Sequence, residues 1–443
     1  MHVIVIGAGI AGLTAARVVA DRADRVTIVE RDRLPDRADD RPGVPQGHHP
    51  HALLVAGNDA LEHLFPGLTD ELAAHGAVRA DAAEDIAFWQ LGGFRTRYHS
   101  GIAVVSATRA LLEHLIRRRV ENRDKIRLMT GVHVRALTGV RAKRVDGIET
   151  TDGRQARADL VIDATGRAGS SGWLRRLELP VPAEHRVRVN VGYATRMLRR
   201  GTGQLDGLLL AGVADTPPRP RFGVAFAVDG DRWQVTLGGW HGDHAPTDPA
   251  AYREFAASLP NPLIARLLDD AEPLTAVRSH TFPASHRRYY ERLPDPPAGY
   301  VAIGDALCAV NPIYGQGMTM AVLQAMELGR AHGDVRAFYR AAARIVDAPW
   351  RIATGADFQF PQTRGRRPPG LTIFNGYVRR VVLGTHVSTG LHDQMLRVQH
   401  LLDPPSTLLR PDIVACAVWH SRRSPAASRP PSGPPTASQP PAA

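Results

Sequence analysis

A glycine-rich loop near the start of the chain has the residue types and spacing that bind a dinucleotide. Its sequence at positions 7–12 is G-A-G-I-A-G. In such a loop the first glycine permits a tight turn, the second lets the backbone approach a pyrophosphate, and the third lets a helix pack closely on a strand. Glu30 follows where a carboxylate can bind ribose hydroxyl groups and would repel a 2′-phosphate. The loop therefore predicts FAD or NAD rather than NADP, and its early place favours FAD, which later segments can enclose.

A second loop, late in the chain, could contact the redox-active ring of such a cofactor. Gly304-Asp305 follows the apolar run 300–303, and the sequence N-P-I-Y-G-Q-G-M occupies 311–318. The two glycines of this stretch allow backbone N–H groups to approach a ring. The positive end of a helix that begins there would stabilise the negative charge of a reduced flavin near N1 and O2. Asp305 is placed at the end of a strand, where it can bind a polar group of the same ligand.

The elements that must position these loops are short apolar strands that alternate with helices. Residues 2–6 and 25–30 are predicted strands, and a helix from 13 to about 21 connects them into a βαβ unit. Further predicted features are strands at 159–163 and 300–303, helices at 59–64, 109–120 and 317–328, and turns at Asp146-Gly147 and Asp152-Gly153.

The middle of the chain has a different pattern, which indicates an antiparallel sheet. In 187–197 the residues at odd positions are mostly apolar and should share one face of a strand. Residues 222–228 and 233–237 alternate in the same way around Asp229-Gly230, which predicts a hairpin. We therefore expect a second lobe built from these strands.

Composition limits the classes of protein to which the chain can belong. Its 443 residues, of which 44% are hydrophobic, suffice for more than one domain and exclude a wholly disordered chain. The net charge is +11, yet the 55 basic residues include only two lysines, Lys125 and Lys143. This bias runs through the whole chain, and the densest run, 117–119, has no interleaved aromatic residues. We therefore predict no nucleic-acid partner.

Cysteine content and hydropathy indicate in which part of the cell the protein is expected. Two cysteines, Cys308 and Cys416, without a C-x-x-C pair exclude a disulfide framework and a dithiol redox centre, and they fit a cytoplasmic location. Cys308 is expected to be a buried packing residue. The apolar stretch 3–20 is interrupted by glycines and Arg17, and no other long apolar run occurs, so we expect no integral membrane span.

The segment His48-His49-Pro50-His51 raises the question of a metal site. Its candidate ligands are adjacent in sequence and interrupted by a proline, whereas first-row metals prefer ligands from several elements. We predict no metal here, and we leave open whether these histidines face the active site or solvent.

The two glycine motifs together resemble those of FAD-dependent monooxygenases of the aromatic-hydroxylase type, known as group A. The second motif reads G-D-A-L-C-A-V-N-P-I-Y-G-Q-G-M at 304–318, and the segment Q-G-H-H-P-H-A-L-L-V-A-G occupies 46–57. Within the group, these two segments most resemble the actinobacterial polyketide epoxidases of polyether pathways, which are relatives of squalene epoxidase. The resemblance follows the order of motifs over roughly residues 1–420.

This resemblance implies a reaction and its cofactors. It implies that one oxygen atom of O2 is inserted, through a flavin C4a-hydroperoxide, into an apolar small-molecule substrate. The leading expectation is epoxidation of a polyketide or isoprenoid alkene in secondary metabolism. The electron source would be NADPH or NADH, used directly or through a separate flavin reductase. The alternatives are a hydroxylase of an aromatic ring and a flavin reductase of double bonds that is similar to geranylgeranyl reductase.

Individual cofactor contacts are also implied by the resemblance. Arg109, at the start of a predicted helix, matches a family arginine that contacts FAD, and Val134 matches a position whose backbone meets the adenine. Most group A hydroxylases have an Asp-Gly pair where this chain has Thr165-Gly166, and that departure puts direct hydride delivery by NADPH in doubt. The motifs and the resemblance together assign cofactor contacts to Gly7, Gly9, Ile10, Ala11, Gly12, Glu30, Arg31, Arg109, Val134, Gly166, Gly304, Asp305, Pro312, Gly315, Gln316, Gly317 and Met318. No side chain is singled out as a catalytic acid or base.

The predicted fold class is α/β, with a Rossmann-type FAD-binding domain of the glutathione-reductase-like kind, interleaved with an antiparallel β-sheet substrate domain and followed by C-terminal helices. The predicted division is 1–170 for the first part of the FAD-binding domain, with 60–105 contributing to the substrate lobe, 171–290 for the substrate domain, 291–334 for the second part of the FAD-binding domain, 335–420 for a helical region and 421–443 for a disordered Pro-rich tail.

Two further functions are weighed against a monooxygenase. A halogenase of this fold would carry a W-x-W-x-I-P motif and a catalytic lysine, whereas the motif is absent and both lysines lie outside the expected region. A non-enzymatic flavoprotein would be expected to lose its glycine loops first, and here they are intact. The aromatic residues of the predicted middle sheet are more typical of core than of substrate contacts; they are Phe222, Phe226, Trp233 and Trp240.

Overall fold

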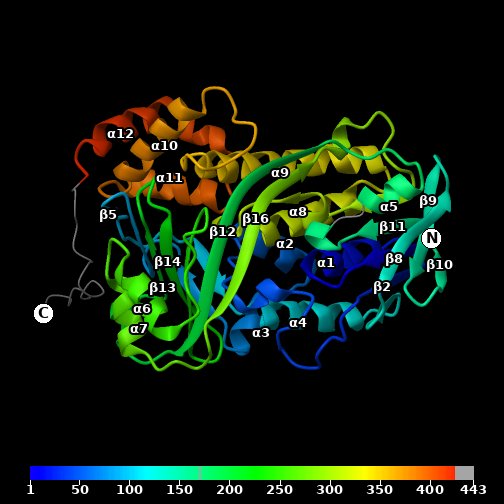
Figure 1. Ribbon diagram of the computed structural model, residues 1–443, viewed down its shortest axis with the longest axis horizontal. Coiled ribbons are helices and arrows are strands. Elements are labelled where there is room, and N and C mark those ends of the chain that lie inside the picture. The colour runs from blue at the N-terminus through cyan, green and yellow to red at the C-terminus, as the bar shows by residue number, and fades with distance from the viewer. Residues whose placement is uncertain (169–170, 425–443) are drawn as a thin grey trace, which may run out of the picture.

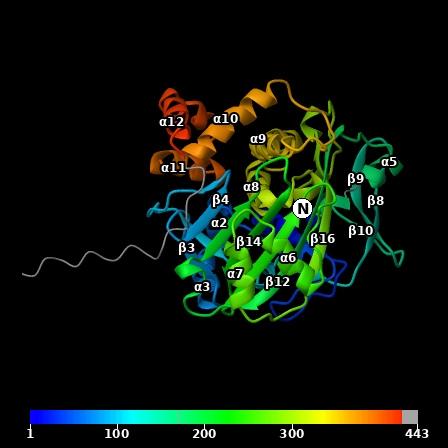
Figure 2. The ribbon, with the colours of Figure 1, turned by 60° about the vertical axis from the view of Figure 1, so that its left-hand side comes forward.

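The computed structural model describes residues 1–168 and 171–424. Two sheets of different kinds dominate this part of the chain, and the C-terminal helices gather at one corner of the molecule (Figure 1, Figure 2). All but the first four residues of the predicted Pro-rich tail, 421–443, lie outside the described residues.

The first sheet has five parallel strands and carries the glycine loop. Its order is β17 (Tyr300–Ala302), β11 (Leu160–Asp163), β1 (His2–Ile6), β2 (Arg25–Val29) and β7 (Ile126–Met129). Val3, Ile4 and Val5 at its centre are fully buried. This continuous apolar run is what a strand covered on both faces requires.

Glycines make the turn from β1 into helix α1 (Ile10–Val19) possible. Gly7 has a φ of +104°, and a Cβ on Gly12 would lie 1.8 Å from the carbonyl oxygen of Gly7. A larger residue at either place would strain the turn or force the helix away from the strand. The helix begins at Ile10 rather than at residue 13, and it packs against α8 (Gly317–Arg330).

The second sheet has eight strands. Its order is β18 (Cys308–Ala309), β16 (Arg278–Arg288), β12 (Glu184–Arg199), β15 (Arg232–Gly239), β14 (Arg221–Val228), β13 (Leu210–Ala214), β4 (Ile86–Gln90) and β5 (Gly93–Phe94). The long strands β12 and β16 cross the centre of Figure 1. The hairpin predicted at Asp229-Gly230 joins β14 to β15 and is confirmed. Neighbouring strands are antiparallel except β13 and β4, which pair in parallel.

The predicted single face over 187–197 is wrong, because β12 contains a bulge. Arg188 pairs with Ala284 and Val191 pairs with Phe282, so β12 has one residue more than β16 between these pairs. Asn190 adopts a φ of +40° there. An extra residue exchanges the two faces of a strand. Val187 and Val191 therefore point to opposite faces of the sheet, although both are buried.

Two smaller sheets complete the strands. They are β10 (Gln155–Arg157), β9 (Arg144–Thr150) and β8 (Val134–Val140) in one sheet, and β3 (Val78–Asp81) and β6 (Ala103–Ser106) in the other. The turn predicted at Asp146-Gly147 is wrong, because both residues lie inside β9. A Cβ on Gly147 would lie 2.1 Å from the carbonyl oxygen of Ala156, so the glycine serves the close approach of β10 instead.

The remaining helices cover the sheets and build the C-terminal corner. They are α2 (Val55–Leu64), α3 (Leu68–Ala74), α4 (Arg109–Glu121), α5 (Ser171–Arg176), α6 (Pro249–Ala257), α7 (Leu263–Asp270), α9 (Val335–Asp357), α10 (Leu371–Gly384), α11 (Thr389–Gln399) and α12 (Pro411–Ser421). Apolar side chains of α6 and α7 pack on the large sheet, and those of α10, α11 and α12 form a cluster of their own. A parallel sheet with a glycine loop, a separate large sheet and C-terminal helices confirm the predicted fold class.

Candidate active site

One continuous cavity of about 920 Å³ runs from the glycine loop to the C-terminal helices. Most predicted cofactor contacts line it: Gly7, Gly9, Ile10, Ala11, Glu30, Arg31, Arg109, Val134, Gly166, Asp305, Pro312, Gly315, Gln316, Gly317 and Met318. Gly12 and Gly304 do not line it. A Cβ on Gly304 would lie 2.8 Å from the Cβ of Ala11, so these two glycines allow close packing behind the cavity wall.

The glycine loop meets two arginines at the wall of the cavity. A Cβ on Gly9 would lie 3.8 Å from Nη2 of Arg109 and 3.9 Å from Nη2 of Arg41. Arg41 comes from the loop after β2, and Arg109 begins α4. Guanidinium groups beside the N-terminus of α1 provide N–H donors where a phosphate would lie.

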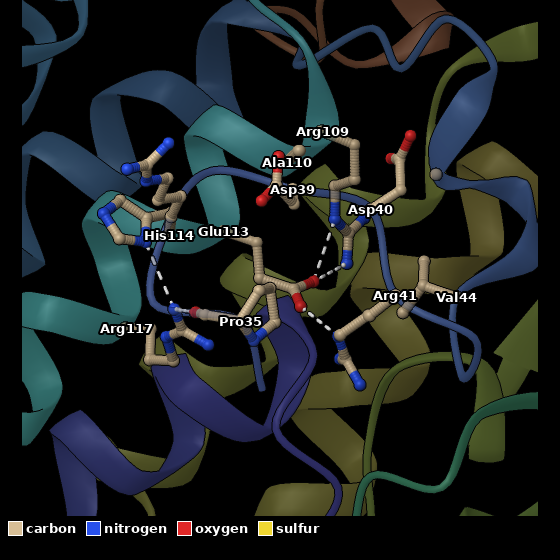
Figure 3. A pocket seen from close by; sticks show the side chains of 12 residues that line it. Pro35, Asp39, Asp40, Arg41, Val44, Arg109, Ala110, Glu113, His114 and Arg117 are labelled. Carbon is tan, nitrogen blue, oxygen red and sulfur yellow. Dashed lines mark hydrogen bonds and ion pairs between the residues drawn. The ribbon is translucent and has the colours of Figure 1, made fainter. Parts of the chain in front are cut away.

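Glu113 fixes both guanidinium groups, as Figure 3 shows in the small pocket behind them. Its Oε1 accepts a hydrogen bond from Arg41 Nε at 2.6 Å, and its Oε2 accepts from Arg109 Nε and Nη2 at 3.1 and 2.9 Å. Burial alone would raise the pKa of Glu113, but Arg109 and Arg41 outweigh it and lower that pKa. The carboxylate is therefore ionised and holds the two arginines in place.

Glu30 follows directly after β2 and lines the cavity. Its Oε2 accepts a hydrogen bond from the backbone N–H of Ala8 at 2.7 Å, and its Oε1 accepts from that of Asp32 at 3.0 Å. Arg41 Nη1 lies 3.1 Å from the same Oε2. The carboxylate thus braces the glycine loop. Each carboxylate oxygen has more than one lone pair, so Glu30 could still accept a hydrogen bond from a ribose hydroxyl group, as predicted.

The second loop brings Asp305 and the start of α8 to the cavity. Burial raises the pKa of Asp305, although Arg167 and Arg109 act against the shift. Gln316 is 3% exposed, and its Oε1 has no hydrogen-bond partner among the described residues. A buried acceptor of this kind is costly unless a ligand satisfies it.

Asp357, the last residue of α9, holds the second loop from behind. Its Oδ1 accepts hydrogen bonds from Trp240 Nε1 at 3.1 Å, Asn311 Nδ2 at 2.8 Å and the Tyr314 hydroxyl at 3.0 Å. Burial raises the pKa of Asp357 to about 6, although the three donors act against the shift. One carboxylate therefore sets the position of both ends of the 311–314 turn.

Thr165 lines the cavity where most group A hydroxylases have an aspartate. Its hydroxyl and its backbone N–H both donate to Asp163 Oδ1, at 2.6 and 3.0 Å. Asp163 is fully buried, and its Oδ2 accepts from the Tyr300 hydroxyl at 2.9 Å. Asp163 does not line the cavity, so its carboxylate does not replace the missing aspartate.

The histidine-rich segment divides between two roles. His48 bonds to Asp40 and Arg278 and does not line the cavity, whereas His49 and His51 do. His49 Nδ1 lies 2.6 Å from Thr195 Oγ1, and its Nε2 is buried without a partner among the described residues. Burial lowers the pKa of His49 to about 3, and nearby His280 contributes to the shift. At neutral pH the ring is uncharged, and it can donate to or accept from a ligand hydroxyl according to its tautomer.

Aromatic side chains form the wall on the side of the large sheet. Phe222, Phe226 and Trp240 line the cavity, whereas Trp233 is buried in the core beneath α6 and α7. Phe222, Trp233 and Trp240 belong to the buried core, as expected, but Phe222 and Trp240 also form part of the cavity wall; Phe226 is only half-buried. Cys308 is buried and does not line the cavity, as expected of a packing residue.

Several residues that shape the cavity carry no local sequence signal. Arg41 lies in a polar loop rich in arginine, and Asp357 and Arg95 lie far from either glycine motif. Only the fold brings Arg41 and Arg95 to the cavity wall and Asp357 to the second loop. Among the described residues, no group of three or more histidine, cysteine or acidic side chains is arranged to hold a metal ion. In the same part of the chain, every helix is too short or too polar to cross a membrane.

These observations fit a bound FAD. The space over Gly9, the two guanidinium groups, the unpartnered Gln316 Oε1 and the starts of α1 and α8 all face one cavity. The lining of the cavity also includes the aromatic side chains of the large sheet, which leaves a part of the cavity for a substrate.

Asp305 provides a test of this fit. Asp305→Ala should weaken FAD binding roughly tenfold without unfolding the protein, because it removes a hydrogen-bonding carboxyl group from the cavity wall. FAD titration of the apoprotein measures the affinity, and urea unfolding checks the fold. Asp295→Ala, at an exposed carboxylate paired with Arg336, is the matched control. An unchanged affinity would remove Asp305 from the cofactor site.

Comparisons with known proteins agree with this geometry. The chain is 31% identical to Protein Rv3254 of Mycobacterium tuberculosis over 452 residues, covering 95% of this chain and 94% of that protein. The profile of the family described as Glucose inhibited division protein A matches residues 2–180. Many solved structures share the fold, and PqsL and Bmp2 are two of them. PqsL of Pseudomonas aeruginosa, a probable FAD-dependent monooxygenase, has a TM-score of 0.59 at 18% identity, covering 81% of this chain and 94% of that one. The flavin-dependent brominase Bmp2 has a TM-score of 0.67 at 15% identity, covering 96% and 100%.

Proposed function

Since the chain belongs to the same family as Protein Rv3254 of Mycobacterium tuberculosis and has the fold of flavin-dependent monooxygenases, we propose that it is an FAD-dependent monooxygenase of an apolar small molecule. The observation that carries this proposal is the single cavity that joins a dinucleotide loop to an aromatic-walled chamber. The predicted location in the cytoplasm and the role in secondary metabolism belong to the same proposal.

The residues of the cavity would divide the work of binding the cofactor. Gly9, Arg41 and Arg109 would hold the pyrophosphate, and Asp305 would accept a hydrogen bond from a hydroxyl of the chain that leads to the flavin. Gln316 Oε1 and the N-terminus of α8 would lie at the flavin ring, where the helix dipole favours negative charge. Bound FAD supplies the oxidising chemistry, passing one oxygen atom of O2 to the substrate.

The apolar walls would place the substrate and exclude water. Phe222, Phe226 and Trp240 provide flat apolar surface on the side of the large sheet. A water-excluding chamber protects a reactive oxidant from hydrolysis. His49 would give the substrate one polar contact in this chamber through its unpartnered Nε2.

Two reactions are compatible with such a chamber. Our first candidate is epoxidation of a polyketide or isoprenoid alkene. The second is hydroxylation of an aromatic ring, which the aromatic walls and the neutral His49 favour, because a phenol could stack on the walls and bond to the ring. PqsL, which shares the fold, binds the aromatic compound 2-aminobenzoylacetate. Bromination is disfavoured, because neither Lys125 nor Lys143 lines the cavity.

We further propose that the electrons from NADPH or NADH arrive through a separate flavin reductase. Most group A hydroxylases have at this position an aspartate that serves both cofactors. This chain has Thr165 there, a neutral residue whose hydroxyl donates to Asp163.

The test combines an absorbance spectrum with oxygen uptake. We expect the purified protein to show a flavin band at about 450 nm. With NADPH, oxygen uptake should occur only when a flavin reductase is added, and supply of an alkene and of a phenol should then show which one gains an oxygen atom. Direct oxidation of NADPH would overturn the two-component proposal, and a protein that binds no FAD would overturn the proposed function.

A further inference from the structure

The far end of the cavity contains a half-buried cation without a counter-ion among the described residues. Arg95 follows β5 and lines the cavity where that strand meets α11. Its Nη1 donates to Gln399 Oε1 at 3.1 Å and its Nη2 to Gln90 Oε1 at 3.3 Å, and both acceptors are neutral amides. Its Nε has no partner among the described residues, and its guanidinium group lies 4.6 Å from the centre of the Phe88 ring.

No acidic side chain compensates this charge. Within residues 1–168 and 171–424, no carboxylate forms an ion pair with Arg95, and burial alone lowers its pKa to about 10. The residues outside that part, 169–170 and 425–443, include no aspartate or glutamate. A guanidinium group held away from water without an anion is costly to the fold.

The neighbouring histidines do not supply charge either. His392 and His400 line the same end of the cavity, and burial lowers the pKa of each, to about 3 for His392 and about 4 for His400. Arg95 itself contributes to the shift of His392. Both rings are therefore neutral at pH 7. The cations that this end of the cavity presents to a ligand are Arg95 and Arg379, an exposed residue of α10.

The position of Arg95 separates it from the predicted phosphate site. β5 lies beside α11 at the C-terminal corner, whereas α1 and the glycine loop lie toward the other end of Figure 1. Apolar side chains of β4, α10 and α11 also line this end of the cavity, among them Phe88, Val382, Met395 and Leu396. The cofactor phosphates already have Arg41 and Arg109 at their own end.

We propose that Arg95 binds the carboxylate of an amphipathic substrate whose apolar body occupies the chamber between Arg95 and the second glycine loop. This inference rests on the proposed function, because it assigns the far end of the same cavity to the substrate. It changes the expected substrate class from a purely apolar molecule to an apolar acid. Arginine binds carboxylates through paired hydrogen bonds, which makes the contact both strong and selective.

The test compares ligands that differ only in charge. Titration calorimetry on the FAD-loaded protein would measure dodecanoate, dodecanamide and dodecyl phosphate as probes. We expect dodecanoate to bind about tenfold or more tightly than the amide, as a charge-assisted contact predicts. Arg95→Gln should remove this preference and leave the amide affinity within about twofold of wild type, and Arg95→Lys should restore part of it.

The matched control is Arg97→Gln, two residues along the chain. Arg97 donates to the carbonyl oxygen of Glu84 and does not line the cavity, so this variant should keep the full preference. A wild-type protein without a preference for the acid, or a preference that survives in Arg95→Gln, would overturn the proposal. Tighter binding of dodecyl phosphate than of dodecanoate would overturn the carboxylate assignment.

The outcome is separable from that of the proposed function. A protein that binds FAD but shows no acid preference would refute only the role of Arg95. A protein that prefers the acid but takes up no oxygen with any reductase would refute the monooxygenase proposal and leave the anion subsite standing.

Discussion

Replacing Gly9 by valine should yield a folded protein that carries no flavin. Gly9 has extended backbone, which valine adopts readily, and its Cβ would meet nothing nearer than the two guanidinium groups at 3.8 and 3.9 Å. The protein alone therefore has room for the Cβ, and the valine methyl groups would meet only the ends of two flexible side chains. The room lies where the proposed pyrophosphate must approach the backbone, so FAD affinity should fall about 100-fold or more. Absorbance at about 450 nm relative to 280 nm after purification, followed by FAD titration, measures the loss.

Two other glycines separate loss of cofactor from loss of fold. Gly390 in α11 has open space around its Cβ, so Gly390→Val should keep both flavin and stability. Gly12→Ala should destabilise the protein itself, because the added Cβ would lie 1.8 Å from the carbonyl oxygen of Gly7. Urea unfolding of all three variants distinguishes these cases. A Gly9→Val protein that purified with a full complement of flavin would contradict the assignment of this loop.

The glycine loop could be predicted because its whole signal is local. A β-branched run, three spaced glycines and a helix follow one another within twenty residues, and each restricts the backbone of its neighbours. The hairpin at Asp229-Gly230 could be predicted for the same reason. Asp146-Gly147 has an identical turn signal but lies in β9, where the approach of β10 decides the need for glycine. Tertiary contacts overrode the local preference there.

Other features depend on pairings that no local pattern records. The bulge in β12 arises from its register with β16, so the alternation 187–197 could not show that its faces exchange. The parallel pairing of β4 with β13 joins segments more than a hundred residues apart. Arg41 and Arg95, which line the cavity, and Asp357, which holds the second loop, come from three separate segments in the same way. Motifs predicted the cofactor end of the site, and the fold alone revealed its far end.

Asp357→Asn should remove a pH dependence of stability that the wild-type protein has. The folded pKa of Asp357 is about 6, whereas the reference value is 3.8. Between pH 4 and pH 6 the folded protein holds a proton that the unfolded chain has released, so unfolding releases a proton. The contribution of Asp357 to the free energy of unfolding therefore falls as pH rises through this window and levels off above it. A shift of about two units corresponds to roughly 3 kcal/mol.

The measurement is the difference in free energy of unfolding between variant and wild type, from urea curves between pH 4 and pH 8. Because all other titrating groups are shared, this difference should rise in favour of Asp357→Asn by about 3 kcal/mol from pH 4 to pH 7. Tyr314→Phe provides a second check, because it removes one donor to Oδ1. With one donor fewer, the ionised carboxylate is less stable and the folded pKa of Asp357 rises. The stability difference should then level off at a higher pH. A difference that stays constant between pH 4 and pH 8 would show that the pKa of Asp357 is the same in the folded and the unfolded protein, and would contradict this prediction.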